Sequence, residues 1–555
     1  MTNFVNEWLA FLLGILVIAS YLFLVKPKTI KIPAIIVLPI SLVGLVLVQM
    51  LFNTAMVFSS AHLAILYLIW AAFLLVVVAN IRDQLGVSKI SLVLSGYFVA
   101  GGFWNFFIEF RHFGFSATGF QIQPELMGVG SLGQRNHLCD YVFLSSCSLL
   151  YLFARNRVGW WILSLGLLFF TAEMTLSTSR TAFLYFLAGA VLIAFWRKMQ
   201  DKVVYQRLFK GYLLFAVLFI VWQSLYPLLV QAVQPLQSHG GAGVTRLIMG
   251  GSSANTPSVR LFFWQEAWEI FLQAPWLGVG VGEYDWAFFM HSQEHSHALI
   301  NNHIEHAHNL FLHIMSEMGL AGLLCVLICG GLWLKQVWQT QVKYYEIGSW
   351  WLCALLITLG IHSMLEYPLW YSHFLGVFAI ILGCYDSRHY TLHFTRLMHG
   401  ALCFIPVFAL YLLIDTGRSF LILEKYYEAA RLGHSIPGDG QEVVAISNGG
   451  LLKPYGMKYF AVMFKLESAH ADERATFTEK AMHFEPIPPL VYKQAAYLAF
   501  DDKPQEALQL FHRSVASYPT FLPDFVEQIN MLPQGDQDKL AFLFDAKTAE
   551  LVAGH

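Results

Sequence analysis

The chain has 555 residues, of which 57% are hydrophobic and only 13% are charged, and its mean hydropathy is +0.55. This composition excludes an ordinary soluble globular protein and indicates a polytopic membrane protein. The formal net charge is −2, so nothing points to nucleic acid as a partner.

Apolar runs long enough to cross a bilayer recur along the first three quarters of the chain. They lie near residues 8–25, 33–52, 62–80, 89–107, 138–154, 159–176, 181–196, 210–233, 310–334, 347–365, 369–385 and 398–416. The first run has no small-residue cleavage site and is followed by more of its kind, so we read it as a retained membrane helix. The sequence therefore predicts an all-α polytopic membrane protein with about twelve transmembrane helices.

Basic residues gather in alternate links between these runs. They are Lys26, Lys28 and Lys31; Arg82 and Lys89; Arg155 and Arg157; Arg197, Lys198, Lys202, Arg207 and Lys210; Lys335 and Lys343; Arg388 and Arg396. The positive-inside rule makes these links cytoplasmic. The opposite side then receives residues 53–61, 108–137, the turn at Arg180, the long loop 234–309, the turn 366–368 and the chain beyond about 416.

A polar cluster precedes the run that begins near residue 138. It comprises Gly133, Gln134, Arg135, Asn136 and His137, and the same link also carries Glu109, Arg111 and His112. One interpretation is a helix cap with solvated neighbours. The other is a substrate site, because amides beside a guanidinium can hydrogen-bond a phosphate or a sugar.

Arg180 is a permanently charged side chain between two apolar runs, with only serine and threonine around it. Arginines at helix ends often extend into the lipid headgroups. However, the positive-inside bias disfavours an arginine on the outer side, which favours an anionic ligand.

The loop 234–309 contains a predicted surface helix that starts near Asn255 or Thr256, with Pro257 in its first turn. Arg260 lies in its first turns, where we expect it to face the same cavity as Arg180. Pro275 and the glycines up to Gly282 then predict a compact loop. The Gly-X-Gly-X-Gly pattern is not a nucleotide fingerprint, because no strand precedes it.

Seven histidines lie between residues 291 and 313. The pairs His295/His297 and His306/His308 do not share a helix face, and we see no accompanying cluster of Asp, Glu or Cys, so we expect no metal site. The seven cysteines of the chain likewise lack zinc or disulfide spacing. We expect no cofactor.

His308 is the strongest candidate for chemistry. His308, Leu312, Met315, Gly319 and Gly322 fall at helical offsets, so we expect them on one face of a helix. Glycines on that face would admit another backbone, which turns the face toward the protein interior. An imidazole there is either structural or functional, and intramembrane ionisable residues are usually functional.

The chain beyond about residue 416 is more charged. Residues 492–519 have the paired-helix pattern of a tetratricopeptide repeat, with Ala495, Ala496, Leu498, Ala507 and Ala516 at packing positions and Pro519 at the end. We therefore divide the chain into a membrane domain, 1–416, and a helical-repeat-like domain, 417–555. Such repeats bind proteins, and we expect the surface around Gln505, Gln509 and His512 to do so.

These motifs resemble the O-antigen ligase and polymerase superfamily of bacterial membrane glycosyltransferases, and within it the protein O-oligosaccharyltransferases that glycosylate pilins and other exported proteins. The family's ligase motif is His, then Asn, Ser or Gln, nine residues, Gly, two residues and Gly; His308, Asn309, Gly319 and Gly322 match it. Arg180, Arg260 followed by Trp264, and the loop 275–282 also fall where the family has them. The segment 362–374, with Glu366 and Tyr367, looks like the oligosaccharyltransferase branch. Arg135 departs from the family, where proline is frequent.

The resemblance implies en bloc transfer of an oligosaccharide from polyprenyl (undecaprenyl) diphosphate to a serine or threonine of an exported acceptor protein. The protein would lie in the bacterial inner membrane, with both the site and the C-terminal domain in the periplasm. His308 would be the catalytic base, and Arg180 and Arg260 would bind the diphosphate without a metal. Gln134, Arg135, Asn136, His137, Asn309, Glu366 and Tyr367 are candidate substrate-site residues. The alternatives are an O-antigen ligase or polymerase and, more distantly, a transporter or flippase, for which we see no inverted repeat.

Overall fold

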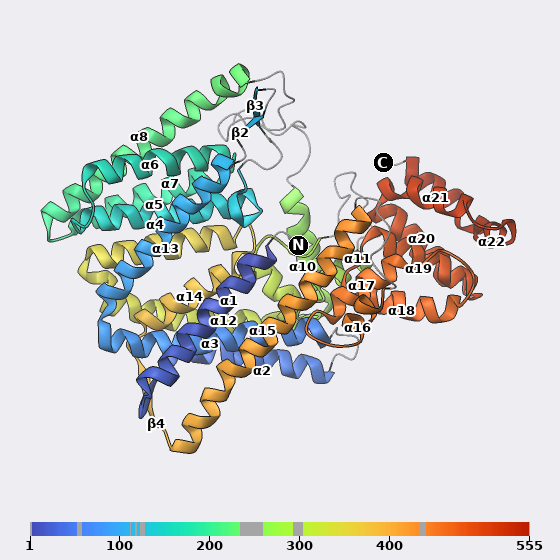
Figure 1. The fold of residues 1–555 in the computed structure, drawn as a ribbon, viewed down its shortest axis with the longest axis horizontal. Helices are drawn as coiled ribbons and strands as arrows, with labels where there is room; N and C mark the ends of the chain where they lie inside the picture. The colour runs from blue at the N-terminus through green and yellow to red at the C-terminus, as the bar shows by residue number, and fades with distance from the viewer. Residues whose placement is uncertain are drawn as a thin grey trace. The chain divides into compact units, whose positions relative to one another are not determined.

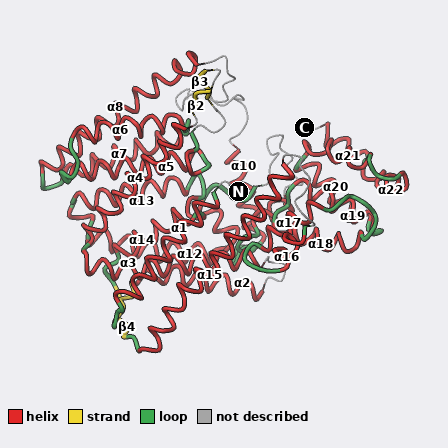
Figure 2. The backbone as a smooth tube through the Cα atoms, viewed as in Figure 1, coloured by secondary structure: helices red, strands yellow, loops and turns green. Residues whose placement is uncertain are grey.

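The computed structural model describes residues 3–52, 58–111, 113–116, 119–122, 128–233, 259–291, 304–431 and 440–553. In this part of the chain the backbone is overwhelmingly helical, and the strands form two short antiparallel pairs (Figure 2). The predicted all-α class is thus confirmed. Two compact units are present: residues 1–37, 70–256 and 328–403 form unit 1, and residues 38–69, 257–327 and 404–555 form unit 2.

Nine helical spans among the described residues are long and apolar enough to cross a membrane. They are Phe4–Val25, Ala34–Phe52, Ser60–Leu85, Val87–Arg111, Arg135–Ala154, Thr181–Lys198, Lys202–Leu228, Leu310–Tyr344 and Arg396–Glu428. Three shorter apolar helices, Trp160–Leu176, Ile347–Ser363 and Ser372–Tyr385, coincide with the remaining predicted runs. The chain is a multi-pass membrane protein, and the number of twelve spans stays a prediction.

Unit 1 is a helix bundle (Figure 1). Its helices and strands are α1 (Phe4–Ser20), β1 (Thr29–Pro33), α4 (Val87–Arg111), β2 (Phe113–Ser116), β3 (Gly119–Ile122), α5 (Arg135–Ala154), α6 (Trp160–Leu176), α7 (Thr181–Phe195), α8 (Lys202–Val233), α13 (Ile347–Ser363), α14 (Ser372–Tyr385) and β4 (His389–His393). It also includes the end of α3 (Phe58–Leu85), the end of α12 (Leu310–Thr340) and the start of α15 (Arg396–Arg431).

Helix α5 is the centre of unit 1 and packs against α4, α6, α8 and α13. Almost all of its residues are buried, because small side chains at 145–148 allow close helix packing. The buried hydroxyl of Ser145 donates to the carbonyls of Phe98 and Tyr141 at 2.7 and 2.8 Å. The amino-terminal end of this rigid helix carries the polar cluster 133–137.

Three of the links predicted to share one side of the membrane meet in unit 1. Strand β1 pairs antiparallel with β4, in register from Thr29–His393 to Pro33–His389. Lys31 Nζ contacts Asp83 Oδ2 at 2.5 Å, and Arg82 donates to the Asp386 carbonyl. The meeting of these segments agrees with their predicted placement on one common side.

Unit 2 contains α2 (Val37–Phe52), the start of α3, the first part of α12, the later part of α15 and a run of shorter helices. The shorter helices are α10 (Val259–Gln273), α11 (Tyr284–His291), α16 (Gln441–Asn448), α17 (Lys453–Met463), α18 (Ala471–Phe484), α19 (Pro488–Phe500), α20 (Pro504–Ser517), α21 (Leu522–Asn530), α22 (Gln534–Leu540) and α23 (Ala546–Ala553).

The C-terminal helices contain the expected pair, α19 and α20, which pack on each other, and α18 packs on α19. Ala495, Ala496 and Ala507 are fully buried. Phe289 of α11 belongs to the same apolar core, and Trp286 packs against it. Helix α15 continues through residue 416 without a break. The domain division at 416/417 and the repeat classification stay predictions.

Candidate functional site

His308 lies just before α12 rather than on it. The helix begins at Leu310, and Asn309 Oδ1 accepts hydrogen bonds from the backbone N–H groups of Phe311 and Leu312 at 3.1 and 3.2 Å. Asn309 is therefore the N-terminal cap. His308 has a left-handed backbone, with φ of 52°. The expectation that His308 shares a helix face with Gly319 is wrong, because the cap turns the chain away from the helix axis.

Helix α10 holds His308 in place. The imidazole stacks on Phe263, with ring centroids 5.5 Å apart and an interplanar angle of 21°, and Trp264 Nε1 donates to the His308 carbonyl at 3.4 Å. Arg260 lies one turn earlier on α10, on the face that contacts His308. Both Arg260 and His308 are partly exposed.

The loop after α10 packs into a break in α12. Gly319 interrupts the helix with φ of 62° and ψ of −162°. The loop fills the break with four hydrogen bonds: Leu320 N–H to Pro275 O, Ala321 N–H to Trp276 O, Val279 N–H to Ser316 O and Gly280 N–H to Glu317 O, at 2.8 to 3.2 Å. A Cβ on Gly278 or Gly319 would come within 2.4 Å of the facing backbone. Two intrahelical bonds are thus replaced by loop bonds, which ties α10 to α12.

Buried ionisable residues that the sequence analysis missed support this arrangement. His313 Nδ1 accepts from the Ala307 N–H at 3.5 Å, next to His308. Its Nε2 lies 3.4 Å from Glu317 Oε2, and Glu317 Oε1 accepts from the Gly282 N–H at 2.9 Å. Gln49 Nε2 donates to the Glu317 carbonyl at 2.7 Å. The i, i+4 spacing of His313 and Glu317 inside an apolar run was the available signal.

In unit 1 the structure brings three of the candidate substrate-site residues together. Glu366 is 3% exposed, and its carboxylate accepts from Asn136 Nδ2 at 2.7 Å and from Gln134 Nε2 at 3.2 Å. The Ser179 hydroxyl donates to Asn136 Oδ1 at 2.6 Å. Gln134 occupies the N-cap position of α5, but its side chain makes no capping bond. The cluster therefore binds a carboxylate of its own chain.

The remaining residues of this cluster differ in exposure. Arg135 Nη1 donates to Thr178 Oγ1 at 3.0 Å, and Arg180, at the start of α7, is exposed. His137 is fully buried and packs edge-on against Tyr371, at a centroid distance of 4.6 Å. Tyr367 stacks on the same Tyr371 at 5.8 Å. His137 therefore lies in the packed interior, whereas Arg180 faces outward.

A group with metal-binding chemistry lies on α10 and α11. His291 Nδ1 is 2.9 Å from Glu266 Oε2, its Nε2 is 3.6 Å from Glu269 Oε2, and the potential ligand atoms of the three residues all lie within 4.8 Å of one another. The expectation that no carboxylates accompany the histidines is therefore wrong for His291, because a turn of α10 places both glutamates beside it. His295 and His297 lie outside the described residues, as do His112, Asn255, Thr256 and Pro257.

Helix α11 also carries a titratable group outside the apolar spans. Burial raises the pKa of Asp285 well above its usual value, and the carboxylates of Glu485, Glu305 and Glu283 raise it further. Burial likewise raises the pKa of Tyr284. An additional negative charge beside Asp285, at the start of α11, is therefore unfavourable.

Comparisons with known proteins cover both parts of the chain. Residues 163–327 match a family model described as O-antigen ligase, and residues 350–529 match one described as virulence factor membrane-bound polymerase, C-terminal. The chain is 25% identical over 396 residues to the general O-oligosaccharyltransferase of Acinetobacter baylyi. The alignment covers 69% of this chain and 66% of that relative's length. The first match contains Arg180, Arg260 and His308, and the second contains Glu366.

Proposed function

We propose that the chain, which we assign to the O-antigen ligase superfamily, transfers an oligosaccharide en bloc from a polyprenyl (undecaprenyl) diphosphate carrier to a protein. The acceptor is the serine or threonine hydroxyl of an exported protein such as a pilin. The transfer takes place on the periplasmic face of a bacterial inner membrane. The relative named as an oligosaccharyltransferase supports this reading of the substrate class.

The observation that carries the proposal is the placement of His308. His308 is partly exposed, yet a helix cap and contacts from α10 hold its backbone and ring. Imidazole titrates near neutral pH and accepts a hydroxyl proton well. In the proposed step His308 takes the acceptor's proton while the hydroxyl oxygen attacks the anomeric carbon. The bond from that carbon to the diphosphate breaks, and the carrier leaves as polyprenyl diphosphate with inversion at the carbon.

Arginines replace a metal at the leaving group in this proposal. Arg260 lies on the face of α10 that contacts His308, and a guanidinium binds phosphate oxygens at two points. The family resemblance suggests Arg180 as the second cation. Neutralising the leaving diphosphate stabilises charge that develops in the transition state.

The Glu366 cluster serves the acceptor or the glycan in this scheme. The amides of Gln134 and Asn136 hold the Glu366 carboxylate, and each amide keeps further hydrogen-bonding capacity for a hydroxyl. Tyr367 follows directly and stacks on Tyr371. We assign this cluster a positioning role, because its carboxylate is buried and already accepts hydrogen bonds from two amides.

An O-antigen ligase or polymerase, which joins a lipid-linked glycan to another glycan, is the second candidate. The descriptions of both matched family models favour it. The two functions differ in the acceptor, so the identity of the glycosylated product distinguishes them.

The test is transfer by the purified chain in detergent, with a lipid-linked oligosaccharide and a pilin as substrates and mass spectrometry as the readout. His308→Ala should lower the rate by about 10²–10⁴, the usual contribution of a general base. The control is His393→Ala, which should retain activity because His393 is an exposed histidine on β4. Retention of more than about a tenth of the rate by His308→Ala would remove the base assignment. Glycosylated lipid or glycan in place of glycosylated protein would favour the second candidate.

A further inference from the structure

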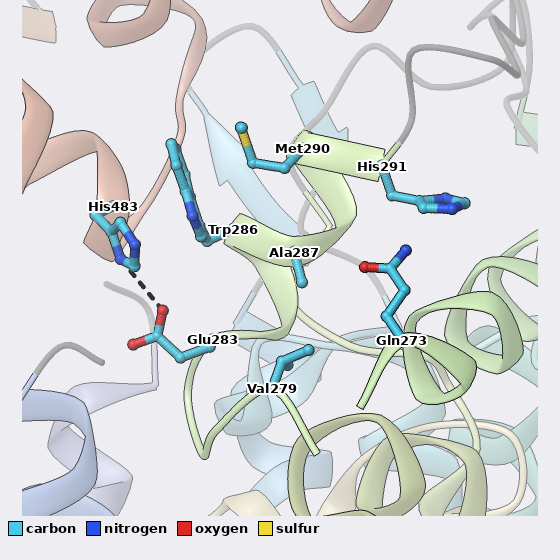
Figure 3. Close-up of a pocket in the computed structure, with 8 residues that line it drawn as sticks. All are labelled: Gln273, Val279, Glu283, Trp286, Ala287, Met290, His291 and His483. Carbon is cyan, nitrogen blue, oxygen red and sulfur yellow. Dashed lines mark ion pairs between the residues drawn. The ribbon is translucent and has the colours of Figure 1, made fainter. Parts of the chain in front are cut away.

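A pocket of about 250 Å³ opens in unit 2 beside α10, α11 and α18 (Figure 3). None of these three helices is among the candidate membrane spans. The polar walls of the pocket come from the side chains of Gln273, Glu283, His291 and His483. Trp286 and Met290 add apolar surface. The helices that line the pocket thus lie outside the candidate membrane spans.

The chemistry of the walls fits an uncharged sugar. An amide, a carboxylate and two imidazoles together offer donors and acceptors for hydroxyl groups, and an indole offers an apolar face. Among the described residues that line the pocket there is no lysine or arginine. Phosphate recognition relies on such cations, so the carrier's diphosphate does not suit this pocket.

The side of the pocket formed by Glu283, Trp286 and His483 is held in place before any ligand binds. Glu283 is 3% exposed, and its Oε2 lies 3.2 Å from His483 Nδ1 of α18 (Figure 3). The Trp286 ring stacks on His483 at 4.5 Å, and Phe289, one turn further along α11, is buried in the core of the C-terminal helices. A site with fixed side chains loses little entropy on binding.

One wall of the pocket, at Gln273, lies away from Trp264, whereas the wall at His291 contacts Glu266, which is two residues after Trp264. Gln273 follows Trp264 by nine residues on α10, which is about 13 Å along the helix axis. Trp264 holds His308, and a base must come within about 3 Å of the proton that it takes. A sugar held at the Gln273 wall is therefore a different one from the sugar attacked at its anomeric carbon.

We propose that this pocket binds an uncharged sugar of the lipid-linked glycan, beyond the sugar whose anomeric carbon reacts. The inference rests on the proposed function and adds a subsite that recognises the glycan at a distance from the leaving group. Gln273 supplies hydrogen bonds from an exposed helix position, and Glu283 supplies an acceptor from the opposite wall. Transfer then depends on glycan length, because a one-sugar donor does not reach the pocket.

The test fills the pocket without disturbing the core. Gln273 is exposed, so the Gln273→Trp variant should fold. The matched control is Gln265→Trp, because Gln265 is exposed on the same helix but does not line the pocket. Donors with one sugar and with a full oligosaccharide are compared. Gln273→Trp should raise KM for the long donor by about tenfold and leave the one-sugar donor unchanged, whereas Gln265→Trp should change neither.

The outcomes separate this inference from the proposed function. If the wild type transfers the glycan but Gln273→Trp leaves the KM for the long donor unchanged, the proposed function stands and the subsite is refuted. A raised KM for the acceptor protein, with donor KM unchanged, overturns it in favour of an acceptor site. If the wild type transfers nothing, the function fails. Saturation-transfer NMR with the free oligosaccharide released from the donor still tests the pocket: signals that vanish in Gln273→Trp support it, and equal signals refute it.

Discussion

Replacing Asn309 tests whether this side chain caps α12 or contacts the substrate. Its Oδ1 already accepts from two backbone N–H groups, of Phe311 and Leu312. Serine caps a helix about as well as asparagine, whereas alanine does not. We therefore expect Asn309→Ser to transfer glycan at nearly the wild-type rate and Asn309→Ala to lose only the contribution of the cap.

The size of the loss distinguishes the two roles. A lost cap costs about 1 kcal/mol. If all of that free energy opposes the ordered position of His308, activity falls by a factor of about five. A direct hydrogen bond to charge that develops in the transition state contributes about 10²–10³ instead.

Initial rates at saturating donor, measured beside the Tm of each variant, decide the matter. If Asn309 acts only as a helix cap, the rate of Asn309→Ala should lie within about tenfold of the wild-type rate, and its Tm should be lower. A fall of more than about a hundredfold in both Asn309→Ser and Asn309→Ala, with unchanged Tm, would refute the reasoning and assign the side chain to the substrate.

Four other predictions follow from the same structure. Arg180→Lys and Arg260→Lys should each lower transfer, because an ammonium cannot make the two-point contact of a guanidinium; normal rates and donor affinity in both would argue for headgroup contacts instead. Transfer should persist in EDTA; loss of activity that magnesium or manganese restores would contradict the metal-free scheme. Lys493 is buried, which lowers its pKa to about 8, whereas the pKa of lysine in the unfolded chain is about 10.4. Between these two values the unfolded state binds more protons than the folded state, so the stability of the fold rises with pH across that interval. Between pH 7 and 9.5 the Tm of the wild type should therefore rise relative to Lys493→Met; a constant difference would exclude the shift. Gln505→Ala with Gln509→Ala on α20 should raise the KM for a pilin and leave donor binding unchanged; an unchanged pilin KM would remove α20 as the acceptor surface.

The C-terminal helices limit how the acceptor surface can be tested. Deleting the chain after residue 416 would uncover Phe289 and Trp286 of α11, which pack with the C-terminal core. His512, expected on the surface, is 9% exposed, and its Nε2 contacts Asp545 Oδ1 at 2.9 Å. Substitutions at exposed positions such as Gln505 are therefore cleaner than truncation.

Local patterns in the sequence predicted the features that depend on neighbouring residues. The apolar runs, the helix after Pro257 and the pair α19 and α20 follow from composition, periodicity and turn residues, and each corresponds to a helix. The glycines of the motif predicted a close approach of another backbone, which the loop 275–280 makes at Gly319.

Features that depend on distant contacts escaped prediction. The break at Gly319 requires carbonyls and amides from a loop some forty residues earlier in the chain. Glu366 meets Asn136 across 230 residues, and no periodicity signals that pairing. His308 has a left-handed backbone beside the helix cap and the contacts with α10. Helical spacing alone therefore predicted, wrongly, that His308 is part of the helix.

The glycine break in α12 also bears on how deep the proposed site would lie in the bilayer. An unbroken helix of 31 residues would be about 46 Å long, well beyond a hydrocarbon core of about 30 Å. The part after the break, residues 320–340, is about 31 Å long and matches that thickness alone. The part before the break, residues 310–318, which is about two and a half turns, is thus not needed for crossing, and it can lie at the water interface. A polyprenyl tail would then stay in the lipid while its diphosphate meets His308 and Arg260 at headgroup level.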